Sequence, residues 1–375
     1  MGNFFNKNKS QNNKSKEKEQ NLNKVKKEQN EKIKSNPFSK SIEKEKLINI
    51  NLINKQAHSK QKDAIIEVIC LPNLENAIII GTKFGDIKEI FQITTKHNIQ
   101  DYSNILLLYS CSKILYSLIL LENNNICLGL SDEILILKFN YEKKDILDKQ
   151  NGEKILDLSI PSEGPIHSLL ELKNGNIISA GKNIILWIKH SSLEYKEANK
   201  IPIGNSRIIN LVEFIFYNTI LASQENTHQI HIFKNNKNSL SLIKSIENVP
   251  SLGYKGSCQK FSKNCMLLIG KFELNMIDPL NGEILSRYPA FGCGNLLNMS
   301  KPNEEIGFWV ISDYIGNYFE FYEQDGNDLI YYNKFDLKED NRIGWGNKLV
   351  KINDKNFAVI NHFGYIFVFE IKKNK

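Results

Sequence analysis

The sequence predicts an all-β protein: a seven-bladed β-propeller behind a disordered N-terminal tail. Three observations lead to this fold class. The body of the chain repeats one strand–turn–strand–turn–strand unit seven times. The third strands alternate with the period of two that a strand requires, as at Ile230 and Ile232. The body nowhere carries the i, i+3, i+4, i+7 apolar stripe of a surface helix.

Each unit contains three strands, and the second of them ends on a small residue. The clearest copy is IHSLLELKNGNIISAGKNIILWI, which begins at Ile166 and contains an Asn-Gly turn. The other units begin at Ile65, Ile114, Ile208, Cys258, Leu296 and Lys348. The residues that end the second strands stand about 47 positions apart and are Gly81, Gly129, Ala180, Ser223, Gly270, Ser312 and Asn361. A period of this size with four strands per unit is typical of a propeller.

The fourth strand of each unit must come from the link to the next unit. The candidates lie at residues 104–110, 153–160, 239–246, 282–289 and 328–335, several of them behind an Asn-Gly or Asp-Gly turn signal. The seventh unit lacks such a link. The alternation in KLININLINK predicts that residues 46–54 pair with the C-terminal strand and cover its open edge. A tandem pair of β-sandwiches is the alternative fold, but it would not need a sevenfold period.

Across residues 46–372 the units resemble the WD-repeat family. Trp187 occupies the place of the motif's Trp and is followed by Ile188 instead of Asp, while the other units place Ile, Phe or Leu there. The resemblance implies a rigid ring that presents variable loops to other proteins.

Charge divides the chain into a tail, residues 1–45, and a body, residues 46–375. Residues 1–62 hold 16 Lys, no Arg and 6 Glu, a net charge of +10, whereas the remainder holds 33 basic and 36 acidic residues, a net charge of −3. The tail is almost wholly Asn, Lys, Gln, Glu and Ser, so we expect disorder there. Because the body is mildly acidic, we expect no nucleic-acid partner, and any electrostatic partner should bind the tail.

The first residues, MGNFFNKNK, resemble an N-myristoylation signal with Gly2 behind the initiator Met, although Asn6 stands where Ser or Thr is usual. Lysines follow closely at Lys7, Lys9, Lys14, Lys16 and Lys18. An acyl chain together with a basic patch is the two-signal arrangement that holds a protein on an anionic membrane. In the alternative reading Gly2 has no role and the lysines only keep the tail soluble.

The cysteines and the longest apolar stretch favour a cytoplasmic protein that can lie on a membrane without crossing it. Six cysteines form no C-x-x-C pair and lie mostly in apolar runs, which indicates a reducing compartment. Residues 105–121 are apolar but are interrupted by Lys113 and several Ser and Tyr residues, so two strands flanking a turn explain them better than a membrane span.

No motif for catalysis, cofactor binding or metal binding is present. His228 and His231 are the one close histidine pair, and we expect them at a polar loop end rather than on a metal. Glycine-rich phosphate loops and a Gly-x-Ser-x-Gly turn are absent. The sequence therefore favours a non-catalytic protein with no cofactor. The alternative is a propeller-fold enzyme of the hydrolase or lyase type with an unidentified site.

In a propeller, the loops ahead of the first strands and those between second and third strands gather on one face. Lys113, Arg207 and Arg342 stand ahead of first strands, and Trp345 lies close by in the sequence. Arg and Trp are over-represented at binding hot spots, so we expect these four residues to contact a protein or peptide partner. The alternative is that they are ordinary loop residues. The predicted function is a protein-interaction scaffold.

Overall fold

The structure is a computed structural model of the whole chain, and residues 1–46 and 47–375 form two compact units. The structure describes residues 48–57, 65–70, 78–83, 85–90, 105–111, 113–140, 145–146, 157–158, 164–191, 194–204, 206–225, 227–249, 257–270, 273–290, 294–300, 306–313, 317–337, 348–361 and 365–373. The predictions for the tail, for Gly2 and for the tail lysines lie outside this part of the chain.

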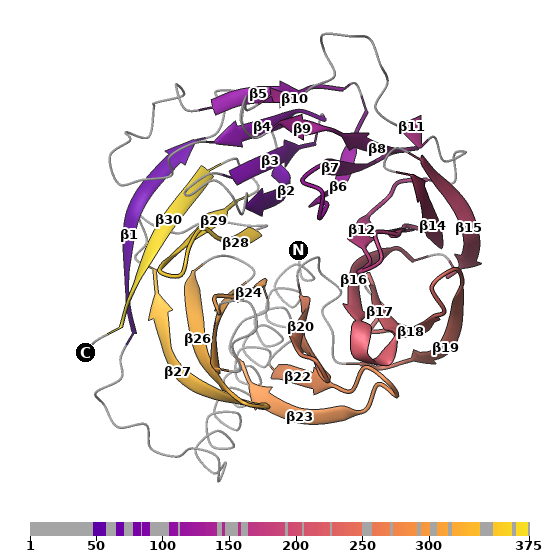
Figure 1. Cartoon of the computed structure of the whole chain (residues 1–375). Helices are drawn as coiled ribbons and strands as arrows, with labels where there is room; N and C mark the ends of the chain where they lie inside the picture. The colour runs from indigo at the N-terminus through magenta and orange to yellow at the C-terminus, as the bar shows by residue number, and fades with distance from the viewer. Residues whose placement is uncertain are drawn as a thin grey trace, which may run out of the picture. The chain divides into compact units, whose positions relative to one another are not determined.

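The described body is an all-β propeller whose strands form seven four-stranded antiparallel sheets (Figure 1). Sheet 1 contains β2 (Ile65–Cys70), β3 (Ile78–Thr82), β4 (Ile87–Ile90) and β5 (Ile105–Tyr109). Sheet 2 contains β6 (Leu115–Leu120), β7 (Ile126–Leu130), β8 (Ile134–Leu137) and β11 (Asp157–Leu158). Sheet 3 contains β12 (Ser168–Glu171), β13 (Ile177–Ala180), β14 (Asn183–Ser191) and β15 (Glu194–Pro202).

The remaining sheets repeat the pattern. Sheet 4 contains β16 (Ile208–Phe214), β17 (Thr219–Gln224), β18 (Ile230–Asn235) and β19 (Leu240–Ile246). Sheet 5 contains β20 (Cys258–Ser262), β21 (Cys265–Ile269), β22 (Glu273–Ile277) and β23 (Ile284–Pro289). Sheet 6 contains β24 (Leu296–Asn298), β25 (Ile306–Ser312), β26 (Tyr318–Asp325) and β27 (Asp328–Asp336). Sheet 7 contains β28 (Lys348–Lys351), β29 (Asn356–Ile360), β30 (Tyr365–Lys373) and β1 (Ile48–Ala57). A separate ribbon pairs β9 (Phe139–Asn140) with β10 (Asp145–Ile146).

Sheet 7 is assembled from both ends of the body. β1 runs antiparallel to β30, with Ile48 opposite Lys373 and Ala57 opposite Tyr365. The expected closing strand at residues 46–54 thus lies at Ile48–Ala57 in the structure and forms the outer strand of sheet 7.

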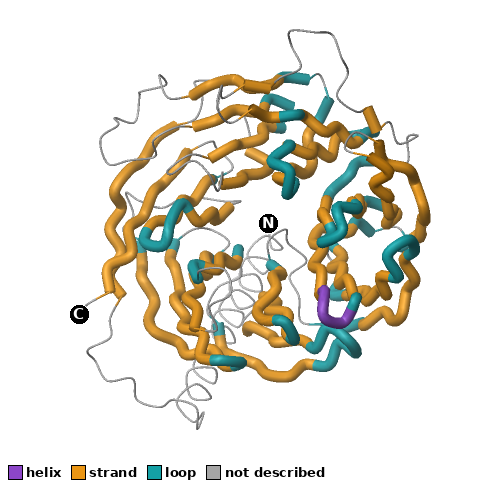
Figure 2. The backbone as a smooth tube through the Cα atoms, in the orientation of Figure 1, coloured by secondary structure: helices purple, strands orange, loops and turns teal. Residues whose placement is uncertain are grey.

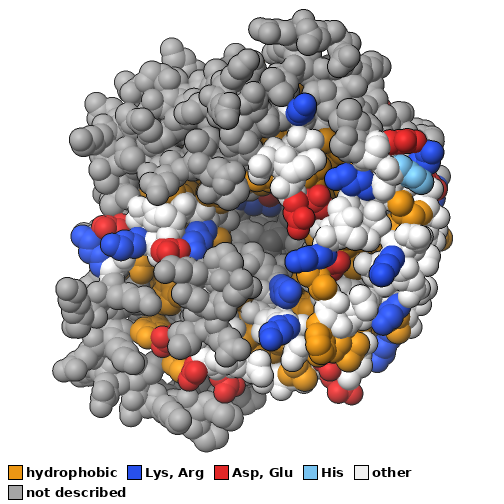
Figure 3. Space-filling view, in the orientation of Figure 1, with side chains coloured by type: hydrophobic (Ala, Val, Ile, Leu, Met, Phe, Trp, Pro, Cys, Tyr) orange, Lys and Arg blue, Asp and Glu red, His pale blue; other side chains and the backbone are white. Residues whose placement is uncertain are grey.

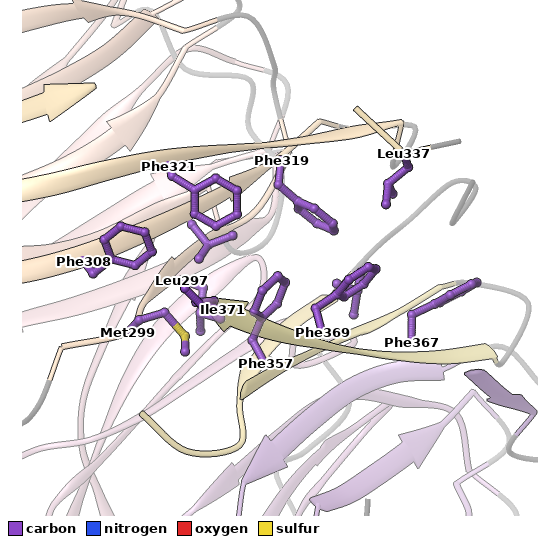
Figure 4. Close-up of a cluster of buried hydrophobic side chains, with 12 residues drawn as sticks. Leu297, Met299, Phe308, Phe319, Phe321, Leu337, Phe357, Phe367, Phe369 and Ile371 are labelled. Carbon is purple, nitrogen blue, oxygen red and sulfur yellow. The ribbon is translucent and has the colours of Figure 1, made fainter. Parts of the chain in front are cut away.

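The core is divided among seven clusters of buried apolar side chains, and each cluster lies between two consecutive sheets. The cluster between sheets 6 and 7 is the most aromatic, and it stacks Phe308 on Phe321 and Phe357 on Phe369 (Figure 4). Another cluster joins Ile78 and Ile80 of sheet 1 to Ile366 and Val368 of sheet 7. Apolar contact therefore runs from sheet to sheet and returns to the first.

Burial falls from the middle of each sheet to its outer edge. Every residue of β3, β7, β17 and β21 is buried, because neighbouring sheets cover both faces of these strands. Continuous apolar sequence, as in ICLGL of β7 and CMLLI of β21, is typical of such strands. The outer strands β19 and β23 are mostly exposed or half-buried.

Steric contacts explain why small residues stand at the ends of the second strands. A Cβ at Gly129 would lie 2.2 Å from Ser117 Oγ and 2.8 Å from the carbonyl oxygen of Ile166 in sheet 3. A Cβ at Gly81 would lie 2.3 Å from Leu115 of sheet 2. The next sheet begins directly against these positions, so no side chain fits there without displacement.

The five predicted fourth strands occur as β5, β11, β19, β23 and β27. The fourth strand of sheet 3, β15, was not predicted because its sequence, EYKEANKIP, is polar and buries only Tyr195. Residues 105–121 form β5 and β6 around a turn, as predicted. Within the described chain, no helix is long and apolar enough to cross a membrane.

Candidate interaction surface

Lys113 lies just ahead of β6 and is held by two carboxylates of its own sheet. Its Nζ is 2.9 Å from Asp132 Oδ1 and 3.1 Å from Glu133 Oε1, both in the loop between β7 and β8. Hydrogen bonding to Asp132 and then to Glu133 raises the pKa of Lys113. The predicted contact residue is therefore a half-buried cation with its acids already beside it.

Arg207 repeats this arrangement in sheet 4. It stands directly before β16, and its Nε lies 3.5 Å from Oε2 of Glu225, the residue after β17. The two residues are also joined through the backbone, where Glu225 N–H donates to the carbonyl of Arg207 at 2.8 Å. Lys113 lies in sheet 2 and Arg207 in sheet 4, with sheet 3 between them. Each cation has its own acidic partners, and the described structure does not join the two into one cluster. Arg342 and Trp345 lie outside the described residues.

On the opposite face, the first strands carry charged residues that reach back to the preceding sheet. The Glu171 carboxylate in sheet 3 accepts a hydrogen bond from the Glu122 N–H of sheet 2. The Glu213 carboxylate in sheet 4 accepts one at 3.1 Å from the Lys173 N–H of sheet 3. Partial burial, the largest cause, raises the pKa of both carboxyl groups. The two glutamates thereby link consecutive sheets.

Lysines occupy the same first-strand position further round the ring. Lys260 in sheet 5 places Nζ 6.0 Å from the centre of the Phe214 ring in sheet 4. Lys351 in sheet 7 donates to the carbonyls of Met299 and Ser300 in sheet 6, both at 2.9 Å. The sequence analysis did not single out this position. Its signal was a charged residue that stands directly before an apolar residue at or next to the end of the first strand.

The turn between β16 and β17 differs from the other described first-to-second turns. Elsewhere these turns are polar and are closed by a side-chain oxygen, as where Asn123 Oδ1 accepts from Asn125 N–H and Asn174 Oδ1 accepts from Asn176 N–H, each at 3.1 Å. In sheet 4 the turn is a 3-10 helix, Ile215–Tyr217, with no side-chain cap. Figure 2 shows it in purple. We call Ile215–Tyr217 the apolar turn.

The apolar turn exposes large hydrophobic side chains. Phe216 is 71% exposed and Ile215 is 46% exposed. The Tyr217 ring packs edge-on against Phe216, with 5.0 Å between the ring centres. In Figure 3 hydrophobic side chains lie where Figure 2 places the turn, and Lys and Arg side chains lie between that region and the hollow at the centre of the face. The sequence analysis missed this feature, although IFY stands where other units have Asn-containing turns.

The two histidines that stood close in the sequence separate in the structure. His228 lies in the loop before β18 with φ 54°, as expected of a polar loop end, whereas His231 is buried in β18. The prediction was wrong for His231. Its Nδ1 lies 2.8 Å from Ser245 Oγ and its Nε2 lies 3.4 Å from Gln224 Oε1. Burial lowers the pKa of His231. Among the described residues, no three His, Cys, Asp or Glu side chains gather as metal ligands would.

Trp187 is a packing residue whose polar atom is satisfied. It is 5% exposed in β14, and its indole N–H donates to Ser179 Oγ of β13 at 2.9 Å. Five cysteines of the described chain are free thiols, and burial raises the pKa of Cys258 and Cys265 to about 12. Thiols with such a pKa are packing groups rather than nucleophiles.

Comparisons with known proteins place the fold and no more. No family model matches the chain, and no curated protein matches it. Among solved structures, the WD40 domain of Neurospora crassa Pan2 matches with a TM-score of 0.60 and 10% identity over 88% of this chain and 96% of that one. BBS1N, from a crystal structure of its complex with ARL6DN, matches with a TM-score of 0.58 and 10% identity over 88% and 98%. The chain therefore has a WD-repeat-like propeller fold.

Proposed function

We propose that the chain is a seven-bladed propeller that acts as a non-catalytic protein-interaction scaffold. The observation that carries the proposal is that the charged side chains fall into two groups, those that link neighbouring sheets and those that stay exposed. Charged residues at the ends of the first strands hold sheet to sheet, as Glu213 and Lys351 do, while other charged and apolar loop residues stay exposed. A rigid ring with exposed loops suits docking, although a fold alone does not determine a function.

The proposed partner contact lies on the face that carries Lys113 and Arg207, and from the sequence we propose Arg342 and Trp345 as further members of this contact. The Lys113 side chain is 36% exposed and the Arg207 side chain is 53% exposed. Each is oriented by acids of its own sheet. An oriented cation loses less side-chain entropy when a partner binds it. The match to BBS1N, solved in complex with ARL6DN, supports a protein partner as the class to test.

Charge reversal on this face tests the scaffold. The double variant Lys113→Glu/Arg207→Glu in the full chain should lose a protein that co-purifies with the wild type. The matched variant Lys196→Glu/Lys200→Glu makes the same charge change on exposed residues of β15 and should keep that protein. Equal recovery by both variants would contradict the contact assignment.

For the tail we propose a membrane tether formed by acylated Gly2 and the lysines at positions 7, 9, 14, 16 and 18. The supporting features are the N-terminal glycine and the basic patch, which together provide two membrane signals. Cells expressing Gly2→Ala should show less of the full-length protein in the membrane pellet. An unchanged amount of protein in the pellet would contradict the acyl anchor. With the anchor, the proposed location is the cytoplasm, at a membrane surface.

A further inference from the structure

We propose that the apolar turn inserts into an anionic membrane surface and that a cluster of lysines around it supplies the attraction. The lysine cluster consists of Lys173, Lys234, Lys237, Lys260 and Lys263. This contact belongs to the body of the protein and does not depend on acylation of Gly2.

The shape of the apolar turn suits insertion. Phe216 and Ile215 are the exposed residues of a three-residue helical turn, and their neighbour Phe214 is fully buried below them. An exposed aromatic side chain on a buried base forms a rigid projection. To bury this projection, a protein partner must offer a matching pocket, whereas a bilayer only has to let its headgroups move aside. Burying a Phe side chain is favourable by roughly 1.5–3 kcal/mol, which corresponds to a change in binding of about tenfold or more.

Three backbone carbonyls in and next to the apolar turn accept hydrogen bonds, which suits a less polar environment. Asn218 N–H donates to the carbonyl of Ile215 at 3.2 Å, and the carbonyl of Asn218 accepts from Asn235 N–H at 2.8 Å. Lys234 Nζ donates to the carbonyl of Tyr217 at 3.1 Å. Because unsatisfied backbone groups are costly near lipid, these three bonds lower the cost of bringing the turn into the interface.

Three of the lysines contact the apolar turn or the strand β16 before it, and the other two lie in the turns after β18 and β20. Lys173 donates its backbone N–H to Glu213, three residues before Phe216. Lys260 lies over the Phe214 ring, and Lys263 follows it in the turn after β20. Lys237 lies in the turn after β18 of the same sheet, where its carbonyl accepts from Asn176 Nδ2 of sheet 3 at 3.0 Å. Four of the five lysines are exposed, and Lys234 is half-buried.

The spread of charge in this region favours a membrane over a protein partner. The five cations come from sheets 3, 4 and 5, and an anionic leaflet attracts all of them without an acid at a fixed position opposite each one. Three acids face the cluster. The Glu213 carboxylate accepts from Lys173 N–H, and the Glu171 carboxylate accepts from Glu122 N–H. The third is Glu122 itself, which is exposed and whose charge acts on both of these carboxylates. Each Lys near an anionic leaflet strengthens binding by about fivefold, and this attraction weakens as salt is added.

The experiment uses the full chain with Gly2→Ala, so that acylation plays no part, and phosphatidylcholine vesicles with or without phosphatidylserine. Phe216→Ser should weaken binding to the phosphatidylserine vesicles by about tenfold. The control Leu285→Ser, which removes a 53% exposed side chain on β23, should leave it unchanged. Lys173→Gln/Lys237→Gln/Lys263→Gln should weaken binding more than the equally charged change Lys182→Gln/Lys196→Gln/Lys200→Gln.

Insertion itself is measured with a reporter at the tip. In Phe216→Trp, lipids brominated on their acyl chains should quench added tryptophan fluorescence, whereas Leu285→Trp should show no such quenching. Equal binding by Phe216→Ser and its control, or absence of quenching at position 216, would overturn the proposal and leave the apolar turn as a protein contact. Either result is independent of the scaffold test on the face that carries Lys113 and Arg207.

Discussion

Ile50 lies opposite Ile371 in the register that pairs β1 with β30, so residues from the two ends of the described chain meet in one sheet. Without β1, the edge of β30 would be a row of unpaired backbone groups. The sheet that closes the ring therefore depends on the segment directly behind the basic tail.

Truncation tests this dependence. Deletion of residues 1–45 keeps β1 and should leave the melting temperature of the body unchanged. Deletion of residues 1–56 removes β1 from sheet 7 and should lower the melting temperature and expose the β30 edge to association. Equal melting of the two truncated proteins would contradict the role of β1 in closure.

A methyl group at Gly129 should push sheet 2 away from sheet 3. Gly129→Ala places a Cβ against Ser117 Oγ and the carbonyl of Ile166, and we expect a loss of about 1–3 kcal/mol in the free energy of unfolding. Denaturant unfolding measures it. Adding Ser117→Ala should restore part of the loss, because the closest clash is with the Ser117 hydroxyl. If Gly129→Ala is neutral, the steric account of the small residue is wrong.

The bond between Trp187 and Ser179 should contribute to the stability of sheet 3. Trp187→Phe leaves the buried Ser179 hydroxyl without its donor and should cost about 1–3 kcal/mol. Ser179→Ala should also destabilise the protein, since it orphans the indole N–H. A double-mutant cycle should show that the two changes together cost less than their sum, and strict additivity would mean that the bond is not formed.

His231 should make stability fall at mildly acidic pH. Burial lowers its pKa, so the folded protein keeps the imidazole neutral while the unfolded chain binds a proton below about pH 6.5. The unfolded state then binds more protons, and the free energy of unfolding decreases as pH drops below that value until the folded-state pKa is reached. Gln224 Oε1 can only accept, so Nε2 carries the single proton of the neutral ring and Nδ1 accepts from Ser245.

The pH dependence is measured by chemical denaturation on either side of this window. His231→Gln should lose less stability on acidification than the wild type does. His190→Gln, at an exposed position of β14, should behave as the wild type does. A wild-type profile in His231→Gln would assign the acid sensitivity to another group.

Strands that are buried on both faces could be predicted from the sequence, and the outer strands only in part. β7 reads ICLGL and β21 reads CMLLI, and such continuous apolar runs are typical of a strand buried between two sheets. β15 escaped prediction because it pairs with one strand only, β14, and its side chains are largely exposed. Turn signals identified β23 and β27, which follow Asn281-Gly282 and Asp325-Gly326, but no such signal precedes β15.

The surface was harder to predict than the fold, because composition does not reveal which charges are already paired. Lys113 and Arg207 were correctly placed ahead of first strands, yet their carboxylate partners come from loops that only the folded sheet brings near. The sequence did not single out Glu171 and Glu213, because their links to the preceding sheet depend on the folded ring. The apolar turn could have been found by aligning the seven units and comparing their turns.

The pairing of β1 with β30 also has a consequence for biosynthesis. β1 leaves the ribosome before every other strand of the body, and its partner leaves last. At about 5–20 residues per second, translation of the intervening residues takes roughly 15–60 s. During that time β1 has no partner strand. The nascent chain can assemble six complete sheets, but β1 must stay available to pair with β30, the last strand to be synthesised.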